Sequence, residues 1–229
     1  MILVLVHGAW HGAWCWERVI PHLKQRGVLV RTVELPSVDA PFESAMDLSC
    51  DAAAVRAVID SSAPVVLCGH SYGGMVISQA ATEARNVRRL IYLCAFMPAE
   101  NESLGDIGGG QLAPWIVKLP DGRTLPDLTR AQELFFGDCD RATAAWAVQQ
   151  LRPQVPMPFL ERVEKPAWRS IPSTYIVCAQ DRAFPPELQR EVFAARASDV
   201  VELDSSHSPF LSQPEQLAKV LAESVSEAR

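Results

Sequence analysis

The chain alternates short apolar runs with longer stretches in which apolar and polar residues recur at helical spacing. Six runs are nearly continuous in apolar character, as expected for strands of a parallel sheet that is covered on both faces. They lie at residues 2–6, 28–33, 65–68, 90–94, 174–178 and 200–203. Helical pattern lies between them near 16–26, 45–61, 72–84, 186–196 and 214–226. This alternation predicts an α/β fold, with a doubly wound, mostly parallel sheet of about six strands and helices on both faces.

One segment departs from this alternation. Residues 97–168 contain eight of the chain's 17 prolines, a glycine triplet at 108–110 and no convincing buried strand. Helical pattern appears there near 130–136 and 143–151. We interpret the segment as a cap inserted after the fourth strand, within a single domain that spans residues 1–229.

Composition and charge exclude several classes of protein. The 229 residues are 48% hydrophobic, which is enough for the core of one domain. The net charge is −6 with no long run of either sign, which argues against nucleic-acid binding and against a basic membrane-binding patch. No apolar run approaches the roughly 18 residues that span a bilayer, and the N-terminal run is too short for a secretory signal. The six cysteines form no C-x-x-C pair and are typical of reduced thiols, so we expect a cytoplasmic protein.

The stretch CGHSYGGMV, residues 68–76, contains the pattern G-x-S-x-G around Ser71. It begins at the end of one predicted strand and runs into a predicted helix. A serine in this strand–turn–helix context is exposed at the carboxyl edge of the sheet, where it can act as a nucleophile. A serine that merely caps the helix is the alternative. The glycines at 69 and 73 favour the nucleophile, because they permit the close backbone approach that the sharp turn requires.

A serine nucleophile needs a base, and the base needs an acid that orients it. His207 is the candidate base, because it lies in the loop after the last predicted strand, where the carboxyl ends of parallel strands build a site. Asp181 is the candidate acid, since it follows the strand at 174–178; its alternative role is a helix cap. Asp204 competes through its closeness to His207 in sequence, but it ends the strand that leads into His207 and is poorly placed to reach the imidazole. The order serine, aspartate, histidine along the chain is the order found in enzymes that carry a nucleophilic serine on a doubly wound α/β sheet.

A tetrahedral oxyanion needs two N–H donors. We expect the backbone N–H of Tyr72, directly after Ser71, and that of Ala9, in the loop after the first strand. The chain has no H-E-x-x-H, no P-loop and no G-x-G-x-x-G after a strand, so neither a metal nor an organic cofactor is expected.

Together these residues resemble the α/β-hydrolase superfamily, and more narrowly the plant methylesterase and hydroxynitrile lyase group with its bacterial carboxylesterase relatives. The similar stretches are VHGAWHGAWCW (6–16), CGHSYGGMV (68–76), YLCAFMP (92–98), LRPQVPMPF (151–159), YIVCAQD (175–181) and HSPFLSQPEQLA (207–218). The resemblance extends from residue 3 to about 220 and includes the inserted segment. It implies either ester hydrolysis or cyanohydrin cleavage.

Two positions favour ester hydrolysis over cyanohydrin cleavage. In the lyases of this group a threonine follows the first-loop histidine and a lysine follows the catalytic histidine. Here these positions are Gly8 and Ser208. Neutral Ser208 cannot stabilise cyanide as an ammonium group does, and Gly8 leaves room for a carbonyl carbon beside Ser71. The prediction is a serine carboxylesterase that works through an acyl-enzyme. Alternatives are a hydroxynitrile lyase, a ligand-binding receptor of the same fold with weak turnover, and a cofactor-free oxygenase or C–C bond hydrolase.

The substrate class rests on the aromatic residues of the inserted segment. Collectively they suggest an apolar pocket with few charged anchors, although each alone could simply pack the segment onto the sheet. The expected pocket residues are Gly8, Trp10, His11, Trp115, Phe135, Trp146, Met157, Phe159 and Ser208, of which Trp10 and His11 are placed at the pocket mouth by the resemblance. The expected partner is a small to medium hydrophobic carboxylic ester, such as a methyl, aryl or pyrethroid-like ester. The resemblance also allows a homodimer.

Overall fold

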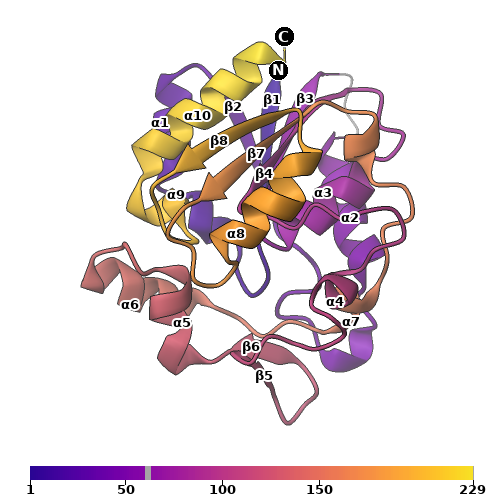
Figure 1. The fold of residues 1–229 in the computed structure, drawn as a ribbon, viewed down its shortest axis with the longest axis vertical. Helices are drawn as coiled ribbons and strands as arrows, with labels where there is room; N and C mark the ends of the chain where they lie inside the picture. Colours follow the sequence, from indigo (N-terminus) through magenta and orange to yellow (C-terminus); the bar gives the residue numbers. More distant parts are fainter. Residues whose placement is uncertain (60–62, 229) are drawn as a thin grey trace.

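The computed structural model describes residues 1–59 and 63–228, and a parallel sheet occupies its centre (Figure 1). Within these residues the central sheet has six strands in the order β2-β1-β3-β4-β7-β8, and every neighbouring pair is parallel. The strands are β1 (Ile2–Val6), β2 (Leu29–Val33), β3 (Val65–His70), β4 (Val87–Leu93), β7 (Ser173–Cys178) and β8 (Asp199–Leu203). The predicted mostly parallel α/β sheet is confirmed. Its order reverses between β1 and β3, which is the doubly wound arrangement.

Burial along the strands follows their place in the sheet. All residues of β3 and β7 are buried, whereas the edge strands β2 and β8 are largely accessible. Central strands are covered on both faces, which is why their sequences are continuous apolar runs. Strand β4 begins three residues before its predicted start, at Val87, in a stretch whose two arginines hid the strand from the apolar pattern.

Helices cover the sheet on both faces (Figure 1). Helix α1 (Val19–Gln25) packs against α10 (Pro214–Glu227), and α2 (Leu48–Ile59) packs against α3 (Gly73–Ala80). The predicted helix near 45–61 corresponds to α2, and its last two residues lie outside the described residues. Shorter helical turns are η1 (Ala13–Trp16), η2 (Phe42–Ser44), α8 (Pro186–Leu188), η4 (Gln189–Phe193), η5 (Ala194–Arg196) and α9 (Pro209–Ser212).

The chain between β4 and β7 leaves the sheet, and we call residues 97–168 the inserted segment. It contains α4 (Leu104–Ile107), β5 (Ile116–Lys118), β6 (Thr124–Pro126), α5 (Leu128–Phe135), α6 (Arg141–Gln150) and α7 (Met157–Leu160), and it ends within η3 (Ala167–Arg169). Figure 1 shows α5, α6 and the antiparallel β5–β6 hairpin beyond the carboxyl ends of the strands. Helices α5 and α6 each begin at an aspartate that caps them, Asp127 and Asp140. The sequence did not predict the hairpin, because its strands are only three residues long and β5 is half exposed.

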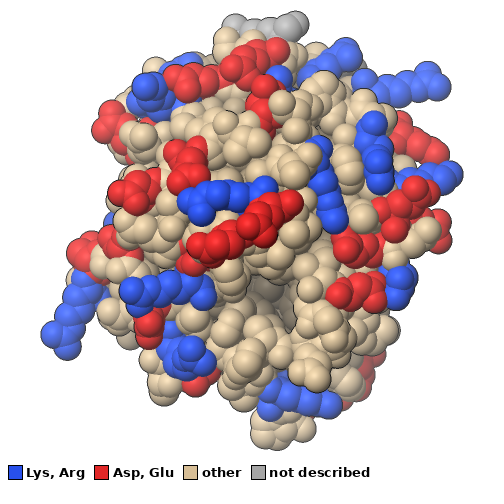
Figure 2. All heavy atoms as spheres, viewed as in Figure 1, with Lys and Arg blue, Asp and Glu red and all other residues tan. Residues whose placement is uncertain are grey.

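The surface carries both signs of charge interspersed over the face seen in Figure 2. No helix in the described part of the chain combines the length and the apolar composition that crossing a bilayer requires. Among the described residues, which include all six cysteines, no disulfide is formed.

Candidate active site

Ser71 lies in the turn between β3 and α3, with its backbone in the left-handed region at a φ of 51°. A residue with a Cβ is sparsely found there, so the surrounding structure must hold the turn. A Cβ on Gly69 would lie 2.4 Å from the carbonyl oxygen of Gly73, and one on Gly73 would lie 2.7 Å from that of His7. Both glycines of the G-x-S-x-G pattern are therefore sterically required. The turn leaves Ser71 partly accessible at the carboxyl edge of the sheet.

The structure brings His207 and Asp181 together at the same edge. Nδ1 of His207 lies 2.7 Å from Oδ2 of Asp181, and both side chains are buried. A carboxylate only accepts hydrogen bonds, so Nδ1 is the donor in this contact, and Nε2 is the ring nitrogen that can take a proton from a nucleophile. Asp204, the competing aspartate, is exposed and instead accepts a hydrogen bond of 2.6 Å from Gln180.

Asp181 is held by further donors. Its Oδ1 accepts from the backbone N–H groups of Ala183 at 2.9 Å and Phe184 at 2.8 Å. Its Oδ2 also accepts from Nε2 of Gln189 at 2.9 Å, and Gln189 is fixed in turn by the backbone of β7. The carboxylate therefore presents one defined edge to the imidazole.

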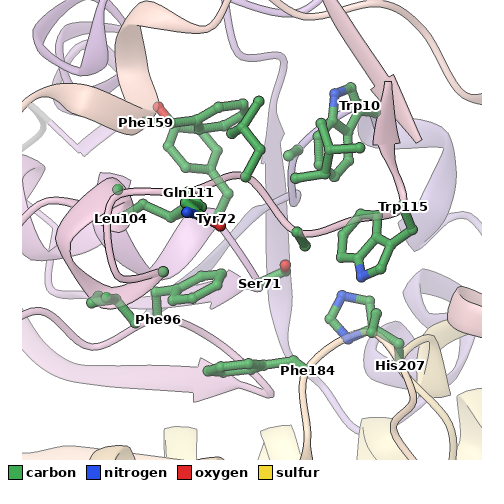
Figure 3. A pocket seen from close by; sticks show the side chains of 18 of the residues that line it. Trp10, Ser71, Tyr72, Phe96, Leu104, Gln111, Trp115, Phe159, Phe184 and His207 are labelled. Atoms are coloured by element: carbon green, nitrogen blue, oxygen red, sulfur yellow. The ribbon is translucent and has the colours of Figure 1, made fainter. Parts of the chain in front are cut away.

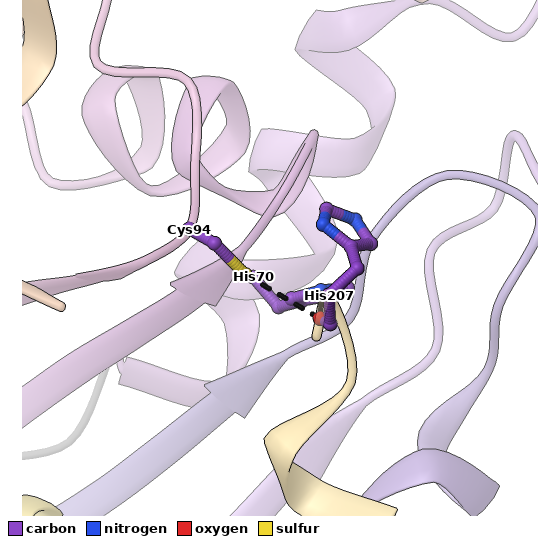
Figure 4. A group of neighbouring side chains, drawn as sticks. All are labelled: His70, Cys94 and His207. Atoms are coloured by element: carbon purple, nitrogen blue, oxygen red, sulfur yellow. Dashed lines mark hydrogen bonds between the residues drawn. The ribbon is translucent and has the colours of Figure 1, made fainter. Parts of the chain in front are cut away.

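The backbone of His207 is fixed separately from its ring. Its carbonyl oxygen accepts from Nε2 of His70 at 2.9 Å and from Sγ of Cys94 at 3.4 Å (Figure 4). Burial lowers the pKa of His70 well below its ordinary value, so this imidazole is neutral. Potential ligand atoms of His70, Cys94 and His207 lie within 4.8 Å of one another, and they are the one such group among the described residues. His70 and Cys94 both donate to the His207 carbonyl, so we interpret the group as one that fixes the His207 loop and not as a metal site.

Ser71 and His207 open into one cavity of about 270 Å³. Figure 3 shows them pointing toward one another between two aromatic walls, with Phe96 and Phe159 on one side and Trp10 and Trp115 on the other. The hollow in the lower half of Figure 2 lies at the same boundary between the sheet and the inserted segment. No aspartate, glutamate, lysine or arginine is found among the described residues that line the cavity.

Five of the expected pocket residues line this cavity, namely Trp10, His11, Trp115, Phe135 and Phe159. Four do not: Gly8, Trp146, Met157 and Ser208. Trp146 is 37% exposed and packs edge-on against Trp14, while Met157 is 50% exposed. Ser208 is buried next to His207, outside the cavity lining. Gly8 lies behind the site, where an added Cβ would come within 3.0 Å of the Ser71 Cβ.

Sequence reasoning missed most of the aliphatic lining and two phenylalanines. These residues are Phe96, Leu104, Ile107, Leu112, Ile116, Leu160, Phe184 and Leu188, together with the polar Gln111. Most come from loops and one-turn helices, where no periodicity marks an inward face. Only Phe96 and Phe184 carried a signal, because each lies within a few residues of the carboxyl end of a predicted strand.

Two backbone N–H groups near Ser71 are left without acceptors. Ala9 and Tyr72 line the same cavity as Ser71. Within the part of the chain that the structure describes, neither of their N–H groups donates a hydrogen bond. The carbonyl of Ala9 accepts from Nδ1 of His11 at 2.7 Å, which fixes the loop after β1. An oxygen that gains negative charge beside Ser71 would have these two donors available.

Comparisons with known proteins agree with this geometry. The model of the alpha/beta hydrolase family matches residues 3–220. The protein named alpha/beta hydrolase nvfD, from Aspergillus novofumigatus, is 28% identical over 247 residues, which cover 99% of this chain and 97% of that protein. A putative chloroplastic methylesterase of Arabidopsis thaliana, methylesterase 14, is 27% identical over 245 residues, which cover 96% of this chain and 70% of the relative.

Among solved structures, a pyrethroid hydrolase from Sphingobium faniae JZ-2 superimposes with a TM-score of 0.85 at 26% identity, covering 99% of both chains. The methylesterase and the pyrethroid hydrolase support ester hydrolysis at the level of the family. The chain belongs to the alpha/beta hydrolase family.

Proposed function

We propose that this protein is a serine carboxylesterase that hydrolyses small to medium hydrophobic carboxylic esters through an acyl-enzyme. One observation carries the proposal. Ser71, held in a strained turn, shares an uncharged cavity with His207, and the ring of His207 is oriented by a buried carboxylate at 2.7 Å. Nucleophile, base and acid are the three groups that acyl transfer requires, and the shared cavity with the oriented ring supports these roles for them.

In the first half-reaction, Oγ of Ser71 attacks the carbonyl carbon of the ester while Nε2 of His207 takes the hydroxyl proton. Asp181 stabilises the imidazolium that forms, and the N–H groups of Ala9 and Tyr72 donate to the oxyanion. The bond between the carbonyl carbon and the alcohol oxygen then breaks. His207 returns its proton to that oxygen, and the alcohol leaves.

In the second half-reaction, water replaces the alcohol. His207 takes a proton from the water as its oxygen attacks the acyl carbon, and the same two N–H groups hold the second oxyanion. Collapse breaks the bond to Oγ, the proton passes from His207 to Ser71, and the carboxylic acid is released.

The cavity supports a neutral, hydrophobic substrate. Its walls are aromatic and aliphatic, and a charged substituent would lose its hydration there without meeting a counter-ion. The absence of lysine from the described lining also disfavours the lyase alternative, which needs a cation for the leaving cyanide. Methyl, aryl and pyrethroid-like esters fit this description, in agreement with the names of the relatives.

Hydrolysis of p-nitrophenyl butyrate tests the proposal. We expect turnover by the wild type with a burst of p-nitrophenol, and a rate at least about a thousandfold lower in Ser71→Ala. Ser78→Ala is the matched control, since Ser78 is a buried serine of α3 whose hydroxyl contacts Gly74 and Tyr92 and lies outside the cavity lining. Similar rates in wild type and Ser71→Ala would overturn the proposal. Absence of turnover across a panel of neutral esters would instead favour the ligand-binding alternative.

A further inference from the structure

A second buried carboxylate, separate from the pair of Asp181 and His207, takes no part in the reaction as written. Asp51 lies on α2 with no exposed surface, on the same helix stripe as Leu48, Val55 and Ile59. Its Oδ1 accepts from the N–H of Ser37 at 2.9 Å. Its Oδ2 accepts from Oγ of Ser37 at 2.6 Å and from the hydroxyl of Tyr72 at 2.7 Å.

The groups that donate hydrogen bonds to Asp51 are all neutral. Among the described residues, no lysine, arginine or histidine forms an ion pair with it. Burial accordingly raises the pKa of Asp51, against the opposing effect of its hydrogen bonds from Ser37 and Tyr72. Burial of an aspartate without a cationic partner costs free energy, which its hydrogen bonds must offset. Such a residue is therefore a candidate for a functional role.

From Ser37 the hydrogen bonds continue to the loop after β1. Nε2 of Gln154 donates to Oγ of Ser37 at 2.8 Å, and Oε1 of Gln154 accepts from the N–H of Trp10 at 3.0 Å. The carbonyl of Trp10 accepts from the N–H of Arg152 at 2.9 Å. Trp10 is thus held at both of its backbone groups, in a left-handed conformation with a φ of 61°. Gln154 itself is fully buried.

This chain of hydrogen bonds ends at Tyr72 on one side and at Trp10 on the other, next to the two proposed oxyanion donors. Tyr72 supplies one of them from its own backbone, and its ring packs edge-on against Phe159 at a centroid distance of 5.4 Å. Trp10 directly follows Ala9, which supplies the other. Asp51, Ser37 and Gln154 therefore link the two halves of the proposed oxyanion site through the protein interior, and Gln154 adds the inserted segment to the link.

We propose that Asp51 is a positioning residue for ester hydrolysis and that Asp51, Ser37 and Gln154 form a brace that fixes the N–H groups of Ala9 and Tyr72 for the oxyanion. The inference rests on the proposed function. Donors that are fixed before the reaction need no reorganisation when charge develops on the carbonyl oxygen. Displacement of a reacting or stabilising group by about 1 Å can reduce the rate about a hundredfold.

The three donors around this position are best matched by a carboxylate. An aspartate offers acceptors to all three donors at once, whereas an asparagine offers one acceptor oxygen and one NH₂ donor. In Asp51→Asn the NH₂ group must therefore face either the Ser37 N–H or the two hydroxyls. The brace is disturbed while the side-chain volume stays the same.

Three variants of the whole chain test the brace, namely Asp51→Asn, Gln154→Met and Tyr72→Phe. The last removes a single hydroxyl and keeps the ring against Phe159, so it carries the test if Asp51→Asn does not fold. With p-nitrophenyl butyrate we expect kcat to fall about tenfold or more and KM to stay within about twofold, because the donors act on the transition state more than on the bound ester. Affinity for butylboronic acid, which forms a tetrahedral adduct with a reactive serine, should fall by a similar factor.

Tyr92→Phe is the matched control for a lost buried hydroxyl. The hydroxyl of Tyr92 is hydrogen-bonded to Ser78 at 2.8 Å, and Tyr92 lies outside the cavity lining. We expect its thermal midpoint to fall about as far as that of Tyr72→Phe, with kcat and boronate affinity unchanged. If the brace variants behave like Tyr92→Phe in all three measurements, they serve stability only and the inference is overturned.

Ser71→Ala is measured in the same series and separates the two proposals. Wild-type activity in Ser71→Ala would overturn the proposed function and the brace with it. Loss of activity in Ser71→Ala together with a wild-type kcat in all three brace variants would overturn the brace alone.

Discussion

Ser71 stands between two hydrogen-bond networks, each built on a buried aspartate, and the two differ in what the aspartate faces. On the base side, Asp181 faces the imidazole of His207 at 2.7 Å, a group that can become a cation. On the oxyanion side, Asp51 faces two hydroxyls and a backbone N–H, none of which gains charge. A carboxylate beside an imidazole can stabilise a developing positive charge, whereas one beside neutral donors can only fix their positions.

The same division holds for two buried histidines. His11 donates to the carbonyl of Ala9 on the oxyanion side, and His70 donates to the carbonyl of His207 on the base side. Burial lowers the pKa of His11 to about 3 and that of His70 well below its ordinary value. Both rings are therefore neutral hydrogen-bond donors that fix a backbone carbonyl. The comparison indicates that the change of charge during the proposed reaction is confined to His207 and the oxyanion.

The largest expected effect comes from Asp181→Asn. The amide can donate to Nδ1 of His207, which moves the ring proton to Nε2 and removes the acceptor for the serine proton. We expect kcat for p-nitrophenyl butyrate to fall about ten-thousandfold, far more than in Asp51→Asn, because a wrong tautomer stops proton transfer while a displaced donor only weakens stabilisation. Asp204→Asn is the control, since this exposed aspartate bonds Gln180 and should leave kcat unchanged. Equal decreases of kcat in Asp181→Asn and Asp51→Asn would contradict the different roles that we assign to the two aspartates.

A smaller effect on kcat is expected from the contact between the inserted segment and the loop that carries His207. Asp138, between α5 and α6, accepts from the N–H of Ser206 at 3.0 Å and also from its hydroxyl. Ser206 precedes His207, so Asp138 corresponds on this side to Gln154 on the other. In Asp138→Ala we expect kcat to fall about tenfold, because the His207 loop loses one of its anchors.

Asp140→Ala is the control for this prediction. Asp140 lies two residues further along and caps α6 by accepting from the N–H of Thr143 at 2.9 Å. Its loss should lower the free energy of unfolding, because α6 loses its N-terminal cap, and leave kcat unchanged. The comparison requires kcat and urea unfolding of both variants. If kcat falls equally in the two, the effect comes from loosening the segment and Asp138 has no specific hold on His207.

The base side could be predicted from the sequence more fully than the oxyanion side. Ser71, Asp181 and His207 each follow a continuous apolar run, and parallel strands bring their carboxyl ends to one edge. The brace joins residues 37, 51 and 154, which no local pattern connects. One signal was readable: Asp51 interrupts the apolar stripe of α2, and a charge in a buried stripe needs partners. The cavity walls could be predicted only in part, because the inward or outward direction of an aromatic residue such as Trp146 depends on tertiary packing.

The last prediction concerns stability and tests whether the buried imidazole of His11 stays neutral, through the dependence of the free energy of unfolding on pH. Folded His11 has a lowered pKa, of about 3, so below a pH of about 6.5 the unfolded chain binds a proton at this site that the folded chain does not. Stability from this site is complete above that pH and is lost as the pH falls toward the folded value. The contribution is about 1.4 kcal/mol per pH unit for each such histidine.

Urea unfolding of wild type and His11→Gln between pH 4.5 and 8 measures this slope, since glutamine can still donate to the Ala9 carbonyl but does not titrate. We expect the wild type to lose about 1.4 kcal/mol per pH unit more than the variant below pH 6, which is one proton's worth. Above pH 7 the difference between the two proteins should be constant, because His11 is neutral in both the folded and the unfolded wild type. An identical acid slope in both would mean that folded His11 accepts a proton as readily as the unfolded chain does. His11 on the oxyanion side would then change its charge with pH. That result would contradict the conclusion that charge changes only at His207 and the oxyanion.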